Sequence, residues 1–133
     1  MLVVVIVVLS IHVLAAVFWA GSTFIQARTG AAGGETLLRP QLGAGAVTVV
    51  FGLILMGLLH RGGFGPMEQV LAVGSVAAVI AGGVQGAMGG PAARRLRADP
   101  ADASARARLA AAQRIAALLL AIALISMVTA KYA

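Results

Sequence analysis

Four long apolar stretches constrain this chain more than any other feature of its sequence. They cover about residues 2–26, 42–60, 67–89 and 109–130. A helix needs about twenty mainly apolar residues to cross the hydrocarbon core of a bilayer, and each stretch is about that long. Only 11% of the residues are charged, whereas soluble domains carry charge at about a quarter of positions. The sequence therefore predicts an all-α integral membrane protein, with one domain over residues 1–133 that forms an up-down four-helix bundle in the lipid bilayer.

The basic residues lie mainly in the connections between these stretches. The chain carries a net charge of +6. A basic connection over about residues 90–108, which begins where Gly89-Gly90-Pro91 is expected to end the third helix, holds Arg94, Arg95, Arg97, Arg106 and Arg108. We expect a helical extension on each side of the Asp99-Pro100 break in this connection, lying at the membrane surface. Short loops rich in Lys and Arg stay in the cytoplasm, so we expect this loop inside and both termini outside, in a bacterial inner membrane. Because the arginines lie between apolar spans, we interpret them as topology signals and expect no nucleic-acid partner.

Small residues recur along the third stretch at four-residue spacing. They are Gly74, Ala78, Gly82, Gly86 and Gly90, and the second stretch offers Gly45 and Gly52 in the same way. Small side chains let helix backbones approach closely in lipid. Two uses are consistent with this pattern: packing inside one bundle, or association as a homo-oligomer or with other membrane subunits.

The first stretch carries the polar groups that point most directly to chemistry. His12 lies about ten residues from the outer end, which places it about 15 Å deep, near the bilayer midplane. An ionisable group at that depth is costly unless it has a partner. A neutral imidazole is a common axial ligand of haem iron, and the alternative is a hydrogen bond to a neighbouring helix, at Thr48 or Gln85. Trp19 suits either helix packing or a cofactor site.

Arg28 ends the first stretch and has two interpretations. It is an anchor that reaches the headgroups, or it is the partner of a carboxylate such as a haem propionate. Polar side chains in or near the other spans predict hydrogen bonds between helices. They are Gln85, Gln113, Ser126 and Thr129.

His60 lies at the outer end of the second stretch. It is too far along the axis from His12 for the two to share one haem, so we interpret it as an interfacial residue or as a weak metal contact with Met56 one turn earlier. The spans have no Asp or Glu in their interiors, which argues against proton-coupled pumps and small multidrug exporters. The chain has no cysteine, so any haem must be held without covalent attachment.

The order His12, Trp19 and Arg28 resembles the first-helix signature of the HemJ-type membrane protoporphyrinogen oxidases. It is similar, more loosely, to the CopD-like copper-resistance membrane proteins. The resemblance covers the first helix. In the HemJ type the histidine of this helix is thought to bind b-type haem. The resemblance therefore implies that His12 ligates the iron and that Trp19 and Arg28 line the same site.

Three functions are compatible with these observations. The first is a haem-binding membrane protein for redox or haem handling, with His12 as the ligand. The second is a non-catalytic accessory subunit of a larger membrane complex, because a small apolar chain poor in ionisable groups suits that role. The third is a copper-handling or other small transport protein. The residues do not decide whether the protein is an enzyme.

Overall fold

The computed structural model describes residues 1–133, and every element in it is a helix. The elements are α1 (Leu2–Arg28), α2 (Gly34–Leu59), α3 (Pro66–Val84), the π-helical turn η1 (Gln85–Gly89), α4 (Gly90–Ala98), α5 (Ala103–Thr129) and the 3₁₀ turn η2 (Ala130–Tyr132). Because α3, η1 and α4 follow one another without a break, the chain has four helices long and apolar enough to cross a membrane. The all-α class and the four apolar spans predicted from the sequence are confirmed.

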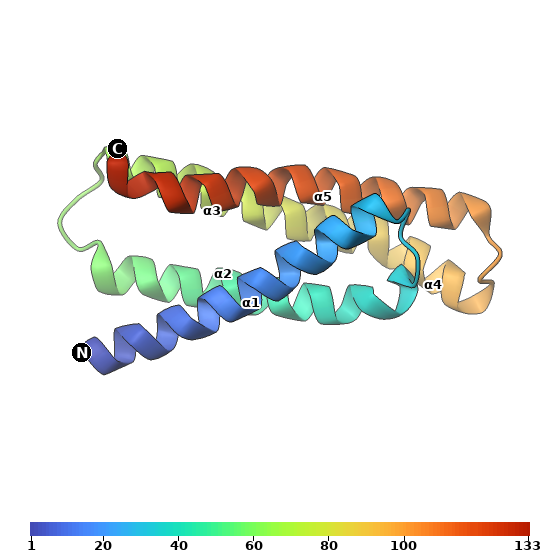
Figure 1. The fold of residues 1–133 in the computed structure, drawn as a ribbon, viewed down its shortest axis with the longest axis horizontal. Coiled ribbons are helices and arrows are strands. Elements are labelled where there is room, and N and C mark those ends of the chain that lie inside the picture. Colours follow the sequence, from blue (N-terminus) through green and yellow to red (C-terminus); the bar gives the residue numbers. More distant parts are fainter.

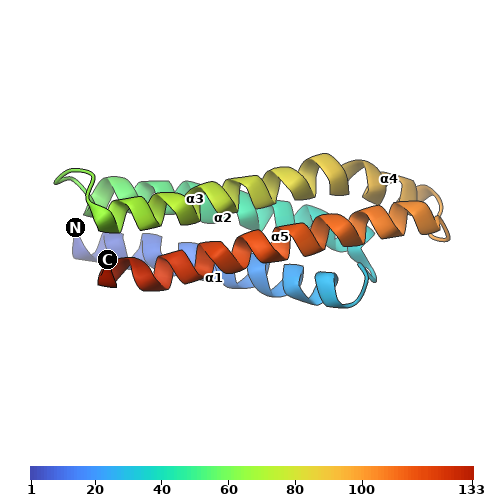
Figure 2. The same ribbon diagram turned by 90° about the horizontal axis from the view of Figure 1, so that it is seen from above.

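The helices lie side by side along one long axis (Figure 1). α1 packs mainly against α2, and α3 packs mainly against α5. α1 also packs on α5, whereas α2 and α3 touch much less. Both chain termini lie at the same end of the molecule in both views (Figures 1 and 2). We call this the terminal end, and we call the opposite end, where the α4–α5 turn lies, the arginine end.

The third long helix does not end at Gly89-Gly90-Pro91, and that prediction is wrong. Gly89 and Gly90 both have right-handed helical dihedral angles, and the chain continues through η1 into α4. Proline lacks an N–H group, and its ring crowds the carbonyl group four residues earlier. The wider π turn directly before Pro91 makes room for the ring, and Pro91 falls in the first turn of α4. The connection of about residues 90–108 is therefore mostly helical, and α4 and the first turns of α5 confirm the helical extensions expected on each side of Asp99-Pro100.

The second helix also begins earlier than the predicted residue 42. The α1–α2 turn ends at Gly33, whose φ of 67° lies in the left-handed region that favours glycine, and α2 starts at Gly34. Pro40 lies inside the helix and removes one backbone hydrogen bond. Leu38 and Gln41, on either side of it, are buried. The packing of these two side chains therefore holds the first turns of α2 in place around Pro40.

Two buried clusters lie along the bundle, and alanine dominates both. The central cluster comprises Trp19, Ala20, Ala77, Ala78, Ala81, Ala116, Leu120 and Ala123. The cluster at the arginine end comprises Ala31, Leu38, Ala92, Ala93, Leu96, Ala105, Leu109 and Ala110. In contrast, residues 2–18 of α1 include no buried side chain. The terminal half of α1 is therefore much less enclosed than the rest of the bundle.

Ion pairs and caps tie the arginine end together. Arg106 donates to the Glu35 carboxylate at 2.6 Å and to the carbonyl of Ala31 at 2.9 Å. Asp102 caps α5 by accepting from the N–H group of Ala105 at 3.0 Å, and it pairs with Arg95 at 3.0 Å. The Ala105 hydrogen bond, with help from Arg95, lowers the pKa of the Asp102 carboxyl group. These contacts fix the α1–α2 and α4–α5 turns against each other.

Candidate functional site

His12 lies in the little-enclosed half of α1 and faces α2. Its Nδ1 lies 2.7 Å from the carbonyl oxygen of Thr48. A carbonyl oxygen only accepts, so Nδ1 carries the proton in this hydrogen bond, and Nε2 of the neutral ring carries the lone pair. Nε2 has no hydrogen-bond partner in the chain and is not a fully buried atom. His12 therefore presents one free acceptor nitrogen in an apolar helix.

Helix α2 has a glycine, Gly52, where the imidazole ring of His12 packs against it. A Cβ atom at Gly52 would lie 3.0 Å from Cε1 and 3.3 Å from Nδ1 of His12, closer than ordinary side-chain contacts. Gly52 therefore leaves the space in which the imidazole approaches Thr48. From the sequence, Gly52 was predicted to pack helices, and in the structure the group that it accommodates is the candidate ligand itself.

Trp19 lies about 10 Å further along α1 and has a different environment. The residue is only 1% exposed. A Cβ atom at Gly45 would lie 2.8 Å from the ring, and one at Gly82 would lie 3.7 Å from it, so two glycines flank the indole. Its Nε1 donates to Oε1 of Gln85 at 2.7 Å. Trp19 is therefore held by packing and by a hydrogen bond, away from His12.

Trp19 belongs to a buried hydrogen-bonded set that we call the glutamine layer, made of Trp19, Thr23, Gln41, Gln85 and Gln113. Nε2 of Gln85 donates to Thr23 Oγ1 at 3.0 Å and to Gln113 Oε1 at 2.9 Å. Nε2 of Gln113 donates to Gln41 Oε1 at 2.8 Å. The layer takes residues from α1, α2, η1 and α5, so each of the four long helices contributes to it.

The prediction of hydrogen bonds between helices is confirmed for Gln85 and Gln113. It is wrong for Thr129, whose hydroxyl group donates to Ile125 of the same helix. Ser126 packs against Gly74 instead. Sequence reasoning missed Gln41, because it lies just before the predicted start of the second helix. The signal that would have found it is its helical spacing with Leu38 and Gly45.

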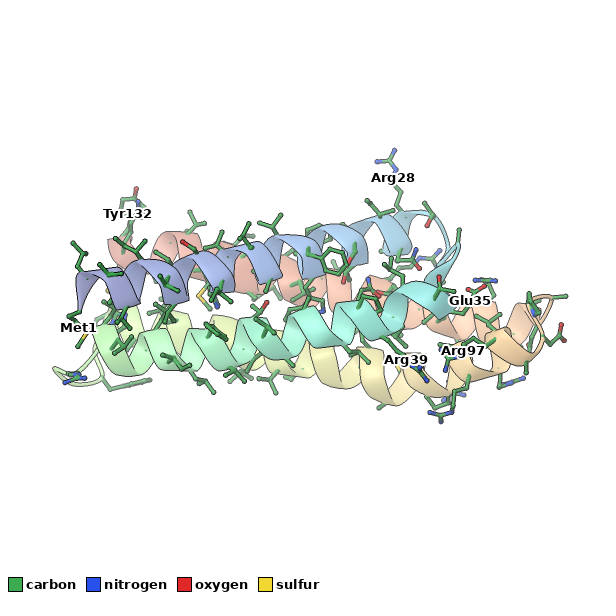
Figure 3. All side chains as sticks on the ribbon, turned by 90° about the horizontal axis from the view of Figure 1, so that it is seen from below. Met1, Arg28, Glu35, Arg39, Arg97 and Tyr132 are labelled. Atoms are coloured by element: carbon green, nitrogen blue, oxygen red, sulfur yellow. The ribbon has the colours of Figure 1, made fainter.

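Arg28 does not approach His12. It is exposed, and it projects outward from the end of α1 (Figure 3). Sixteen residues separate it from His12, which corresponds to about 24 Å along a helix. A haem propionate does not span that distance from iron held at His12. The three residues that carry the family resemblance are therefore not brought together into one site.

His60 pairs with Glu68 across the α2–α3 turn, with Nδ1 2.8 Å from Oε1. The other carboxylate oxygen of Glu68 accepts from the N–H group of Gly65 at 2.9 Å. These residues line an open cavity of about 750 Å³, and Met56 is not part of its lining. No three His, Asp or Glu side chains come together in a group that could hold a metal ion.

The small residues of the third helix do not keep one common face. A Cβ atom at Gly74 would lie 2.8 Å from Ser126 on α5, and Gly82 faces Trp19. Nothing lies within 4 Å of a Cβ position at Gly86, and only Arg94 approaches Gly90, at 4.0 Å. The π turn shifts the register, so that Gln85 and Gly89 are the buried residues in this region.

Comparisons with protein-family models, with curated proteins and with solved structures found no match to this chain.

Proposed function

We propose that this chain is an integral membrane protein that binds b-type haem through Nε2 of His12. The observation that carries the proposal is the hydrogen bond from His12 Nδ1 to the Thr48 carbonyl at 2.7 Å. Histidines that bind a metal through one ring nitrogen commonly donate the other N–H to a backbone carbonyl, which fixes the tautomer and orients the ring. His12 has that arrangement, and its second nitrogen is free.

The residues that would hold the group are few. His12 supplies the axial nitrogen, Thr48 orients it, and Gly52 provides room for the imidazole. When bound, haem iron supplies one-electron redox chemistry, whose potential depends on the axial ligands. We assign Trp19 to the glutamine layer and Arg28 to the surface, which departs from the roles that the family resemblance implies.

The fit is partial because His12 lines neither the cavity beside His60 nor a second cavity between α2 and α3. His12 is the one residue of this chain that would hold the iron, and a second ligand would be water, a methionine or a group from another subunit. This requirement favours a site shared between polypeptides, in keeping with the little-enclosed terminal half of α1.

We place the bundle in a bacterial inner membrane with an up-down topology. The arginine end would face the cytoplasm, and both termini would lie outside. The support is the distribution of charge. Arg28, Arg39 and Arg97 lie at the end opposite Met1 and Tyr132 (Figure 3). Basic residues of short loops are retained in the cytoplasm.

A visible absorption spectrum of the purified protein tests the haem proposal. Protein from haem-replete cells should show a Soret band and the bands of b-type haem. His12→Ala should abolish them while the protein remains inserted and folded, and His60→Ala should leave them intact. A colourless wild-type protein would refute the proposal, as would a His12→Ala variant with full haem content.

A second candidate is a non-catalytic subunit of a larger membrane complex. The observation that favours it is that residues 2–18 of α1 include no buried side chain. Purification in a mild detergent should then recover a second membrane protein in fixed ratio, from wild type and from His12→Ala alike. Recovery of this chain alone, as a monomer, would remove this candidate.

Copper handling at His60 remains a weaker alternative, since the imidazole pairs with Glu68.

A further inference from the structure

We propose that the α2–α3 side of the arginine end binds one anionic phospholipid, with its phosphate on arginines and an acyl chain in an apolar groove. The inference goes beyond haem binding and rests only on the membrane placement proposed above. It is independent of His12.

The groove lies where α2 and α3 separate. A cavity of about 280 Å³ lies between them, with the Trp19 ring in its lining. Leu42, Ala46 and Val49 line it from α2, and Val79 lines it from α3. Ala46 and Val79 are exposed residues, so the cavity opens to the outside of the bundle. In a membrane, that outside is lipid, and the lining is almost wholly apolar.

A group of arginines lies at the cytoplasmic end of this groove. Arg39 precedes Leu42 by three residues on α2, which places both on one side of the helix. Arg97 donates to the Glu35 carbonyl at 3.0 Å, so α4 meets α2 one turn before Arg39. Figure 3 shows Arg39 and Arg97 near the α2–α4 junction. Arg94 lies one turn before Arg97 on α4.

The charge of this group is not neutralised within the chain. The three ion pairs of the structure are His60–Glu68, Arg95–Asp102 and Arg106–Glu35, and none includes Arg39, Arg94 or Arg97. Glu35, whose carbonyl accepts from Arg97, directs its carboxylate to Arg106. Guanidinium groups bind phosphate oxygens well. These arginines therefore have no anionic partner within the chain. Because they lie at the end of a lipid-facing groove, a phospholipid fits the site better than a free phosphate does.

The fluorescence of Trp19 reports on lipid in the groove, because Trp19 is the only tryptophan of the chain and lines the groove. The protein is reconstituted in vesicles of phosphatidylcholine that contain a minor fraction of lipid with brominated acyl chains. The brominated lipid is phosphatidylglycerol in one sample and phosphatidylcholine in the other. His12→Ala is present throughout, so that haem cannot quench the indole and the result does not depend on the haem proposal.

Brominated phosphatidylglycerol should quench Trp19 more strongly than brominated phosphatidylcholine. Removing one arginine should lower this lipid selectivity about fivefold, given the usual strength of a single basic residue at an anionic surface. Arg39→Gln should therefore reduce the excess quenching, whereas Arg28→Gln should not, since Arg28 is also exposed at this end but projects from α1 (Figure 3). Ala46→Phe should fill the groove and reduce quenching by both lipids.

Equal quenching by the two brominated lipids would overturn the proposal, because it would show that the headgroup is not recognised. Absence of quenching by either lipid would also overturn it, because the groove would then not admit an acyl chain. A selectivity that survives Arg39→Gln, Arg94→Gln and Arg97→Gln together would exclude the arginine group as the binding site.

Discussion

At the scale of single residues, the polar side chains differ in whether their hydrogen bonds are complete. Within the glutamine layer, every buried nitrogen and oxygen atom has a partner, and in the whole chain the buried side-chain atom without one is Oε1 of Gln26. His12 is different, because one ring nitrogen is engaged and the other is accessible. This contrast is the reason to assign structure to the glutamines and chemistry to the histidine.

The glutamine layer predicts a large effect at Gln85. Gln85→Ala removes the partner of Trp19 Nε1 and two bonds to Thr23 and Gln113, and each buried polar group left unpaired costs about 1–3 kcal/mol. Measured hydrogen bonds between membrane helices average about 0.6 kcal/mol, so we expect a total loss of about 1–3 kcal/mol. Reversible unfolding in mixed micelles measures it.

Gln69→Ala is the matched control for this substitution. Gln69 is also a helical glutamine, but it is exposed, and its side chain makes no hydrogen bond. Its replacement should change the unfolding free energy by less than about 0.5 kcal/mol. If both variants unfold like wild type, the glutamine layer does not stabilise the bundle.

At the scale of the elements, the glycines decide how closely the helices approach. Gly45 and Gly82 enclose the Trp19 ring from two helices, while Gly52 receives His12. The π turn then changes which side of the third helix faces inward, from Gly82 before it to Gly89 after it. One glycine-rich pattern therefore serves several different contacts.

Two glycines of α2 give a matched test of this interpretation. Gly45→Ala should lower the unfolding free energy by about 1–3 kcal/mol, because the new methyl group would overlap the Trp19 ring. Gly43 has nothing within 4 Å of a Cβ position, so Gly43→Ala should be neutral or stabilising by up to about 1 kcal/mol. Similar stability of the two variants would show that the close approach at Gly45 is not required.

Much of this architecture could be predicted from apolar length alone, since four spans follow from hydropathy. The course of the third helix could not, because Gly89-Gly90-Pro91 is a reliable helix end unless a π turn precedes it. At His12 the sequence predicts either a haem ligand or a hydrogen bond to a neighbouring helix, and the structure confirms the hydrogen bond, to Thr48. The separation of Arg28 from His12 follows from the sixteen residues between them on one helix. The environment of Trp19 could not be predicted in this way, because it depends on Gly45, Gly82 and Gln85 of other helices.

At the scale of the whole molecule, charge and enclosure divide the bundle into two halves. The ion pairs Arg106–Glu35 and Arg95–Asp102 lie at the arginine end. The terminal half of α1 has no buried residue before Trp19. We therefore propose contact with lipid headgroups at the arginine end, and cofactor or partner binding at the terminal half.

Two reporters test the proposed topology, one fused at the C-terminus and one inserted in the α4–α5 turn. A reporter that is active only after export should work when fused after Ala133, because both termini are expected outside. A reporter that is active only in the cytoplasm should work when inserted in the 99–102 turn. The reverse pattern would invert the orientation and would place the arginine end outside the cell.

We propose that His12 binds haem while the glutamine layer stabilises the fold. The haem content per folded protein in His12→Ala and Gln85→Ala, each compared with wild type, tests both assignments. We expect His12→Ala to lose the haem while apoprotein stability falls by less than about 1 kcal/mol, since one interhelical hydrogen bond is removed. We expect Gln85→Ala to keep haem in its folded fraction while it unfolds more readily. Loss of haem in Gln85→Ala with retention in His12→Ala would contradict the account and would place the cofactor at the glutamine layer.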